Sequence, residues 1–264
     1  MNGDGTRPGA WLTPEAATTF GAAASAYAAH RPGYPRDAVR WALGDAYRPG
    51  MRVLDLAAGT GKVSEALAGL PVEVVAVDPD PAMLAELRRS LPGRPALRGS
   101  AERIPLADAG FDAVLVGQAF HWFDQVAAMA EIRRVLRPGG LLAAMWNVWD
   151  DGGDWVRGLA DVSGNQITVS GWLRHADVPR HPAFLPPVRA EFRHTPTQTV
   201  ESILAMVSTY SYVIALADDQ RAAFTDRVEA YLRTATAPPG HAFAIPHVTS
   251  VVRTAAAPVA GDRS

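Results

Sequence analysis

The chain has 264 residues, of which 48% are hydrophobic, and its formal net charge is −2. That length and composition suffice for one substantial core, so we expect a single domain over residues 1–264. Lys62 and the arginines are scattered along the sequence, which argues against a nucleic-acid partner. Cysteine is absent, so disulfides, thiolate zinc sites and cysteine nucleophiles are excluded. The sequence shows neither a signal-peptide pattern nor a run of about 18 apolar residues, and we expect a cytoplasmic protein with no membrane partner.

The N-terminal part of the sequence predicts a helical lid over residues 14–46. An alanine-rich stretch at 14–29 carries Tyr27 on its apolar, helically spaced face. The RPGYP segment at 31–35 ends this helix, because proline and glycine interrupt helices. A second helix is expected over residues 36–46.

Residues 50–147 alternate between short apolar strands and helices. Strands are expected at 52–57, 72–77, 96–98, 111–116 and 141–146, helices at 62–69, 82–90 and 126–136, and a turn at 137–140. Such alternation predicts parallel strands buried on both faces, which is a doubly wound, mostly parallel α/β sheet.

After Asn147 this rhythm ends in a cap and C-terminal region over 148–256. Tryptophans and prolines dominate residues 150–187, and such an irregular segment predicts a cap insertion over a site or on the surface. Beyond it, strands are expected at 188–195 and 247–255, and helices at 200–216 and 219–234. The predicted sheet therefore has seven strands in all.

The most informative segment is VLDLAAGTG at 53–61, a strand that runs into a glycine-containing turn and a helix. Open α/β sheets bind ligands at the carboxyl ends of their strands, so a nucleoside ligand is expected here. Asp78, at the end of the second strand, suits the two hydroxyls of a ribose. A nicotinamide site is disfavoured because Ser64 stands where the third glycine of its fingerprint belongs. Asp55 would repel a pyrophosphate but attract the ammonium of an amino-acid ligand.

The segment LDLAAGTG at 54–61 resembles the first motif of the class I S-adenosylmethionine-dependent methyltransferases. Four further segments agree with that family in order and spacing. They are Asp78-Pro79, GSAERIPL at 99–106, QAFHWF at 118–123 and LRPGG at 136–140. The resemblance covers about residues 50–147, and the opening with Tyr27 and RPGYP resembles the subgroup related to trans-aconitate methyltransferases. It implies a Rossmann-like methyltransferase fold and S-adenosylmethionine as the cofactor.

The resemblance also implies roles for individual residues. Gly59 and Gly61 admit the methionine part of the cofactor, and Asp78 holds its ribose. Ser100 replaces an aspartate that often binds the adenine, and Ala57 replaces a glycine whose carbonyl receives the methionine ammonium. The full expected cofactor set is Tyr27, Arg31, Asp55, Ala57, Gly59, Gly61, Asp78, Pro79, Ser100, Ala101, Glu102 and Gln118.

Methyl transfer from a sulfonium is an in-line displacement, so alignment of the reactants contributes most and a strong base is optional. His121, after the fourth strand, is the candidate base or orienting residue, and the alternative is that it only walls the pocket. The expected substrate contacts are Tyr34, His121, Trp122, Trp146, Asn147 and Tyr210. The histidines show no metal-ligand spacing, and no metal is expected.

Three functions remain open from the sequence. The leading one is methylation of a small molecule, with oxygen or nitrogen favoured over carbon, by a monomer or homodimer. The second is a protein that binds S-adenosylmethionine without transferring its methyl group. The third is a nicotinamide-dependent oxidoreductase, which Ser64 makes the weakest of the three.

Overall fold

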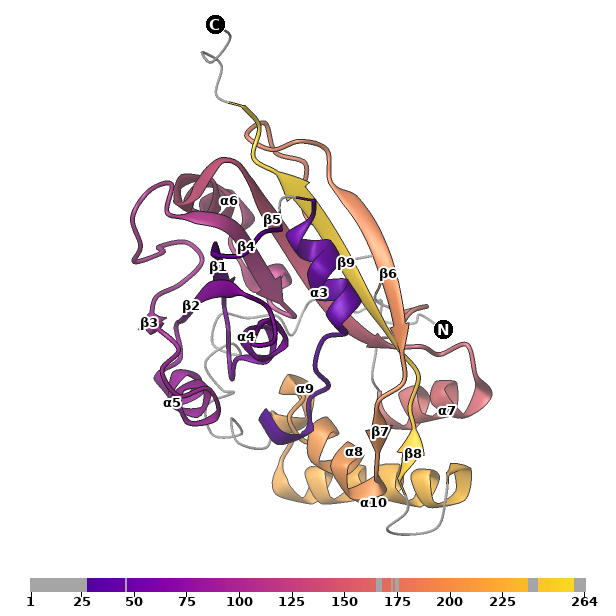
Figure 1. Cartoon of the computed structure of the whole chain (residues 1–264). Coiled ribbons are helices and arrows are strands. Elements are labelled where there is room, and N and C mark those ends of the chain that lie inside the picture. The colour runs from indigo at the N-terminus through magenta and orange to yellow at the C-terminus, as the bar shows by residue number, and fades with distance from the viewer. Residues whose placement is uncertain are drawn as a thin grey trace, which may run out of the picture.

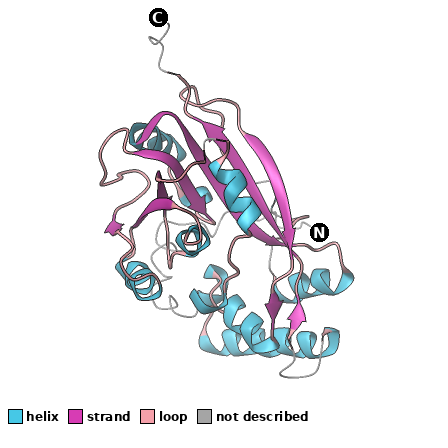
Figure 2. Cartoon of the chain, viewed as in Figure 1, coloured by secondary structure: helices cyan, strands magenta, loops and turns pink. Residues whose placement is uncertain are grey.

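Seven strands form one sheet in the order β3-β2-β1-β4-β5-β9-β6, with helices over both faces (Figure 1 and Figure 2). The computed structural model describes residues 28–45, 47–164, 168–171, 173, 176–236 and 242–258. The strands are β1 (Met51–Leu56), β2 (Val72–Asp78), β3 (Ala96–Arg98), β4 (Phe111–Gly117), β5 (Leu136–Trp149), β6 (Val188–His194) and β9 (His247–Ala255). Strands β1 to β5 pair in parallel, while β9 runs antiparallel to both β5 and β6. The predicted doubly wound, mostly parallel seven-stranded sheet is confirmed.

Strand β5 is longer at both ends than the sequence predicts. It begins at Leu136, so residues 137–140 belong to the strand, and its register against β4 shifts between Phe111 and Ala113. It continues to Trp149 because β9 supplies partners as far as the pair Trp149 and His247. This extension carries β5 past the edge of the parallel strands.

Helices pack on the two faces of the sheet and bury two separate apolar layers. The helices beside the parallel strands are α3 (Arg36–Leu43), α4 (Lys62–Leu67), α5 (Pro81–Ser90) and α6 (Gln125–Val135). One layer joins α3 and α4 to the sheet through side chains such as Leu43 and Val63. The other joins α6 to the opposite face through Ile132. Helix α3 ends earlier than the predicted residue 46, because Gly44 turns the chain with a φ of 66°.

A second group of helices lies together beyond the end of the sheet (Figure 1). These are α7 (Asp154–Ser163), α8 (Val200–Val207), α9 (Ser211–Ile214) and α10 (Asp218–Ala235), with the antiparallel pair β7 (Thr197–Gln198) and β8 (Phe243–Ala244). They share a core of their own that includes Leu159, Ile203 and Val228. None of the helices in the described parts of the chain combines the length and apolar character that a bilayer crossing requires.

This helical group corrects the sequence prediction in three places. Residues 154–163 form a helix where an irregular cap segment was expected, because Val156, Leu159 and Ala160 recur at helical spacing and are buried. The helix predicted over 200–216 is two helices, broken between Val207 and Ser211. The small sheet of β7 and β8 was not predicted at all.

Candidate functional site

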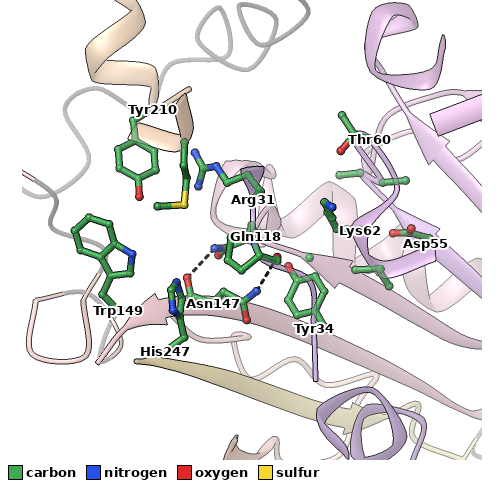
Figure 3. A pocket seen from close by; sticks show the side chains of 17 residues that line it. Arg31, Tyr34, Asp55, Thr60, Lys62, Gln118, Asn147, Trp149, Tyr210 and His247 are labelled. Atoms are coloured by element: carbon green, nitrogen blue, oxygen red, sulfur yellow. Dashed lines mark hydrogen bonds between the residues drawn. The ribbon is translucent and has the colours of Figure 1, made fainter. Parts of the chain in front are cut away.

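A cavity opens at the carboxyl ends of β1, β4 and β5, the edge at which open α/β sheets bind ligands. Its walls also include the segment before α3, the region of α8 and the start of β9. Figure 3 shows Asp55, Thr60 and Lys62 toward one end and Trp149 and His247 toward the other. The cavity therefore has two ends of different chemical character.

The first end holds buried polar side chains, chiefly Asp55 and Thr60. Asp55 is fully buried, and its Oδ2 accepts hydrogen bonds from the N–H and hydroxyl of Ser64, at 2.9 and 2.7 Å. Burial raises the pKa of Asp55 to about 7, although the bonds from Ser64 favour the charged form. Among the described residues, neither its Oδ1 nor the buried Oγ1 of Thr60 has a hydrogen-bond partner. Such orphaned oxygens in a cavity wall suit a ligand that brings hydrogen-bond donors or positive charge.

The backbone around the cavity is strained. Three non-glycine residues in the described chain have a positive φ, and two of them, Ala57 at 55° and Gln118 at 56°, line the cavity. They follow the ends of β1 and β4. Because left-handed backbone costs energy for residues with a Cβ, its concentration at one cavity indicates a functional site.

Asp78 connects β2 to the turn after β1. Its carboxylate accepts hydrogen bonds from the N–H groups of Gly59, at 2.7 Å, and Asp80, at 2.9 Å. Burial raises the pKa of Asp78 to about 6, opposed by these two bonds. Asp78, at the end of β2, thus holds the turn that contains Gly59 in place.

Gln118 and Asn147 join the middle of the cavity to the N-terminal segment. The side-chain amide of Gln118 donates to the Asn147 carbonyl at 2.8 Å, and that of Asn147 donates to the carbonyls of Pro32 and Gly33 (Figure 3). The Oδ1 of Asn147 accepts a bond from the Thr249 hydroxyl at 2.5 Å. Asn147 therefore ties the segment before α3 to β5 and β9 at once.

The second end is aromatic and apolar, with one imidazole. Trp149, Met206 and Tyr210 line it together with His247. The guanidinium of Arg31 lies over the Tyr210 ring, 4.5 Å from its centroid, and its Nε donates to the Thr209 hydroxyl at 3.2 Å. The N-terminal segment thus reaches the helical group, as the neighbouring indigo and orange ribbons in Figure 1 also show.

The structure brings eight of the predicted site residues to this cavity. They are Arg31, Tyr34, Asp55, Ala57, Gly59, Gln118, Asn147 and Tyr210. Tyr27 lies outside the described residues. Gly61 does not line the cavity; it starts α4 with a φ of 90°, and a Cβ there would lie 2.9 Å from the Leu87 side chain.

The predicted adenine-side residues lie away from the lining of the cavity. Pro79 is exposed and accepts a bond from Arg98, and Ala101 is buried against the α6 layer. Glu102 accepts a hydrogen bond from the N–H of Asp124, just before α6, and Ser100 forms an isolated bridge with Arg103. Their assignment to the cofactor remains a prediction.

Three predicted residues gather elsewhere. His121 stacks on Trp122, with ring centroids 5.2 Å apart, and its Nδ1 accepts a long bond of 3.4 Å from the Trp146 indole. Trp146 packs in the α6 layer because successive residues of β5 point to opposite faces, so Trp146 and the cavity-lining Asn147 diverge. Burial lowers the pKa of His121 to about 4. The catalytic role of His121 stays a prediction, made for a residue that does not line the cavity.

Nine further residues that are not in the predicted site set line the cavity, and Thr60, Lys62, Trp149, Met206 and His247 are among them. Thr60 and Lys62 lie within or beside the glycine turn and were within reach of the motif argument. Trp149 and His247 become neighbours only through the register of β5 and β9, which sequence spacing does not reveal.

The fold and the position of the cavity define an open α/β protein with a ligand site at the carboxyl edge of its sheet. A family model described as "Methyltransferase domain" matches residues 54–144. An uncharacterized methyltransferase of Mycobacterium tuberculosis (strain ATCC 25618 / H37Rv) is 42% identical over 241 residues, 89% of this chain and 94% of that protein. An uncharacterized methyltransferase-like protein of Schizosaccharomyces pombe is 33% identical over 209 residues, 77% of this chain and 81% of that protein.

One solved structure agrees with these relatives. A candidate type II methyltransferase from Anaeromyxobacter dehalogenans is 27% identical, with a TM-score of 0.64 over 86% of this chain and 99% of that chain. The chain belongs to the class I methyltransferase family.

Proposed function

We propose that the protein transfers a methyl group from S-adenosylmethionine to an oxygen or nitrogen of a small-molecule acceptor. The observation that carries this proposal is the first end of the cavity, where Asp55 Oδ1 and Thr60 Oγ1 are buried, beside the strained Ala57, without a partner in the described part of the chain. An ammonium and a carboxylate presented by an amino-acid ligand complement an acidic oxygen, a hydroxyl and the nearby Lys62. Members of this family typically use that donor.

The polar groups of this chain suit the cofactor. Asp55 and the Ala57 carbonyl would face its ammonium, and Asp78 would accept from its ribose hydroxyls. Arg31 would pair with its carboxylate. The adenine would lie toward Pro79, Ser100 and Ala101, with Glu102 and Tyr27 completing the set. When bound, S-adenosylmethionine supplies a methyl group on a positively charged sulfur.

The chain's own contribution is chiefly positioning. Gln118 and Asn147 hold the middle of the cavity rigid by their hydrogen bonds to β5 and to the N-terminal segment. A rigid wall keeps the acceptor atom and the methyl group in line, and such alignment can supply on the order of 7 to 11 kcal/mol of barrier reduction. With cofactor and acceptor bound, the aromatic end would exclude water from the reacting atoms.

Calorimetric titration with S-adenosylhomocysteine and S-adenosylmethionine tests the proposal first. Saturable binding of both is expected, followed by release of S-adenosylhomocysteine when S-adenosylmethionine is supplied with a broad panel of phenols, alcohols and amines. Absence of binding at millimolar concentration would overturn the proposal. Binding without release across the panel would favour the non-catalytic alternative.

Several finer assignments are also part of the proposal. We infer a cytoplasmic protein, acting as a monomer or homodimer without metal or nucleic acid. Kinship with trans-aconitate methyltransferases rests on the RPGYP segment at 31–35 and remains a prediction.

A further inference from the structure

We propose that His247 is the acceptor-side residue of this site and that the acceptor is a neutral aromatic compound whose hydroxyl donates a hydrogen bond to the Nε2 atom of His247. This inference rests on the proposed methyl transfer and names its substrate class.

His247 is the first residue of β9, paired with Trp149 at the end of β5. Its side chain is buried, with an exposed fraction of 3%, and it lines the cavity. Its Nδ1 lies 2.9 Å from the Ile245 carbonyl oxygen. Because a carbonyl only accepts hydrogen bonds, Nδ1 carries the hydrogen and Nε2 of the neutral ring presents a lone pair.

The surroundings of His247 keep the ring neutral. Burial lowers its pKa to about 4, with a smaller lowering by His194 of β6 and an opposing effect of the bond to Ile245. The two imidazole rings are 5.5 Å apart. A neutral imidazole beside a bound sulfonium avoids a second positive charge in the same cavity.

The walls around His247 select an aromatic ring without charge. Trp149 approaches from β5, and Met206 and Tyr210 approach from the α8 region, so three large apolar surfaces surround one hydrogen-bond acceptor. Tyr210 lies across the cavity from His247 (Figure 3). The charged Asp55 and Lys62 lie toward the opposite end. This combination suits a phenol-type ring, which fills the aromatic space and donates one hydrogen bond.

Arg31 lies beside this end of the cavity but does not favour an anionic acceptor. Its Nε donates to the Thr209 hydroxyl and its guanidinium lies over the Tyr210 ring, and in the proposed function it pairs with the cofactor carboxylate. An anionic acceptor would have to compete with that carboxylate for the guanidinium. A neutral hydroxyl group does not need a contact with the Arg31 guanidinium.

The chemical step balances within these residues. The acceptor oxygen forms a bond to the methyl carbon while the sulfur–carbon bond breaks, and the electron pair of that bond remains on sulfur. The O–H bond of the acceptor breaks, its electron pair stays on the oxygen, and the proton passes to Nε2 of His247. The positive charge thus moves from sulfur to the imidazole, and the proton returns to solvent after the ether product leaves.

His121, the base expected from sequence, is held elsewhere. Its Nδ1 accepts from the Trp146 indole in the α6 layer, and the residue does not line the cavity. The geometry therefore favours His247 for the contact to the acceptor.

Binding to the wild-type protein gives the first test. With the protein saturated with S-adenosylhomocysteine, we expect 2-naphthol to bind at least about tenfold more tightly than 2-methoxynaphthalene, which has no donor, and than the anion 2-naphthoate. Equal binding of 2-naphthol and its methyl ether, or preference for 2-naphthoate, would overturn the inference. Failure to bind S-adenosylhomocysteine at all would instead overturn the proposed function.

Two variants separate the hydrogen bond from the proton transfer. His247→Gln keeps an acceptor oxygen near the position of Nε2 but cannot take up a proton, whereas His247→Phe keeps only the ring shape. We expect 2-naphthol affinity to fall about tenfold in His247→Phe and to remain within about threefold of wild type in His247→Gln, whose kcat falls by about 10² or more. His181→Gln, in a loop outside the cavity, is the matched control and should leave both quantities unchanged.

S-adenosylhomocysteine affinity is measured for each variant to show that the first end of the cavity is intact. Wild-type binding and turnover of 2-naphthol by both His247 variants would overturn the inference. If His247→Phe does not fold, ¹⁵N-histidine spectra of the wild type decide the matter. The Nε2 signal of His247 is assigned as the one that is missing from the spectrum of His247→Gln. Addition of 2-naphthol should shift this signal, and an unshifted signal would refute the contact.

Discussion

Asp55 is a fully buried carboxyl group at the carboxyl end of β1. Its Oδ2 is satisfied by Ser64, but its Oδ1 has no partner among the described residues. A buried charge with an unsatisfied oxygen destabilises the ligand-free fold, which explains why the pKa of Asp55 rises to about 7. The same oxygen becomes favourable once a cationic ligand occupies the cavity.

Asp55→Asn should therefore stabilise the ligand-free protein while weakening its binding. At about pH 8 we expect the free energy of unfolding to rise by about 1 to 3 kcal/mol, since the buried charge is removed, and S-adenosylmethionine affinity to fall about tenfold. Urea unfolding and calorimetry measure the two quantities. Loss of stability together with unchanged affinity would contradict this account of the residue.

The stability of the ligand-free wild type should also depend on pH. The pKa of Asp55 is about 7 in the fold against an ordinary 3.8, so the folded state retains a proton that the unfolded chain has released. The stability contributed by this carboxyl is present below about pH 4 and is lost as the pH rises through about 7. Urea unfolding between about pH 5 and pH 8 should show this fall, and Asp55→Asn should reduce it. Some fall should remain, because the pKa of Asp78 is raised in the same direction; an identical profile in the variant would exclude Asp55 as a source.

Asp78→Ala removes both the expected ribose acceptor and the anchor of the Gly59 turn. We expect the affinity for S-adenosylhomocysteine to weaken by about 1.5 to 3 kcal/mol, the usual scale for hydrogen bonds to charged groups. Calorimetry measures the change, and Asp219→Ala on the exposed start of α10 serves as control. Unchanged affinity would refute the role of Asp78.

At the scale of elements, the end of β4 is packed without spare room. A Cβ at Gly117 would lie 2.6 Å from the Val63 side chain of α4 and 2.7 Å from the Tyr34 hydroxyl. The absence of a side chain at this point is what allows the segment before α3 and the start of α4 to meet over β4. The cavity floor therefore depends on one glycine.

Gly117→Ala should destabilise the protein by about 1 to 3 kcal/mol, because overpacking forces neighbouring side chains aside. The double variant with Val63→Ala should recover part of that loss by removing the nearest contact. Gly69→Ala, where nothing lies within 4 Å of the added Cβ, is the control. Denaturant unfolding compares them, and equal stability of Gly117→Ala and wild type would show that the floor adjusts freely.

At the scale of the whole molecule, the cavity is closed by parts of the chain that are far apart in sequence. Arg31 bonds to Thr209, and Asn147 bonds to the backbone of Pro32 and Gly33. The N-terminal segment therefore bridges the sheet and the helical group. Its position should decide whether the acceptor end is closed.

Asn147→Asp tests this bridge with little change of shape. The carboxylate loses both N–H donors and faces the carbonyls of Pro32 and Gly33, so the segment should detach. Hydrogen exchange measured by mass spectrometry should show faster exchange over residues 31–35. Thr249→Val, which removes the hydroxyl from the other side of Asn147 but leaves its donors, should alter exchange there much less. Equal protection in Asn147→Asp and wild type would mean that the segment is held by other contacts.

Local sequence signals predicted the sheet and the first end of the cavity, because β-branched strands, the glycine turn and Asp55 lie within short motifs. The residues at the acceptor end of the cavity could not be predicted from short motifs. Trp149 and His247 are brought together by an antiparallel pairing of distant strands, and Trp146 was expected beside Asn147 although alternation along β5 separates them. Helix α7 was missed because its glycine and its tryptophan-rich surroundings masked a helical spacing of buried residues.

The place of β9 between β5 and β6 has a consequence for how the protein emerges from the ribosome. Strand β6 pairs with β9, and β9 begins more than fifty residues after the start of β6. During translation β6 therefore remains unpaired until β9 has been synthesised. Its charged residues Arg189, Glu191 and Arg193 recur at every second position, the kind of pattern that discourages mispairing with other nascent chains. Neutralising those three side chains should therefore lower the soluble yield from cells, and it should also lower the stability of the folded protein, because Arg189 donates to the carbonyls of Leu173 and Ala176 and Arg193 pairs with Asp150.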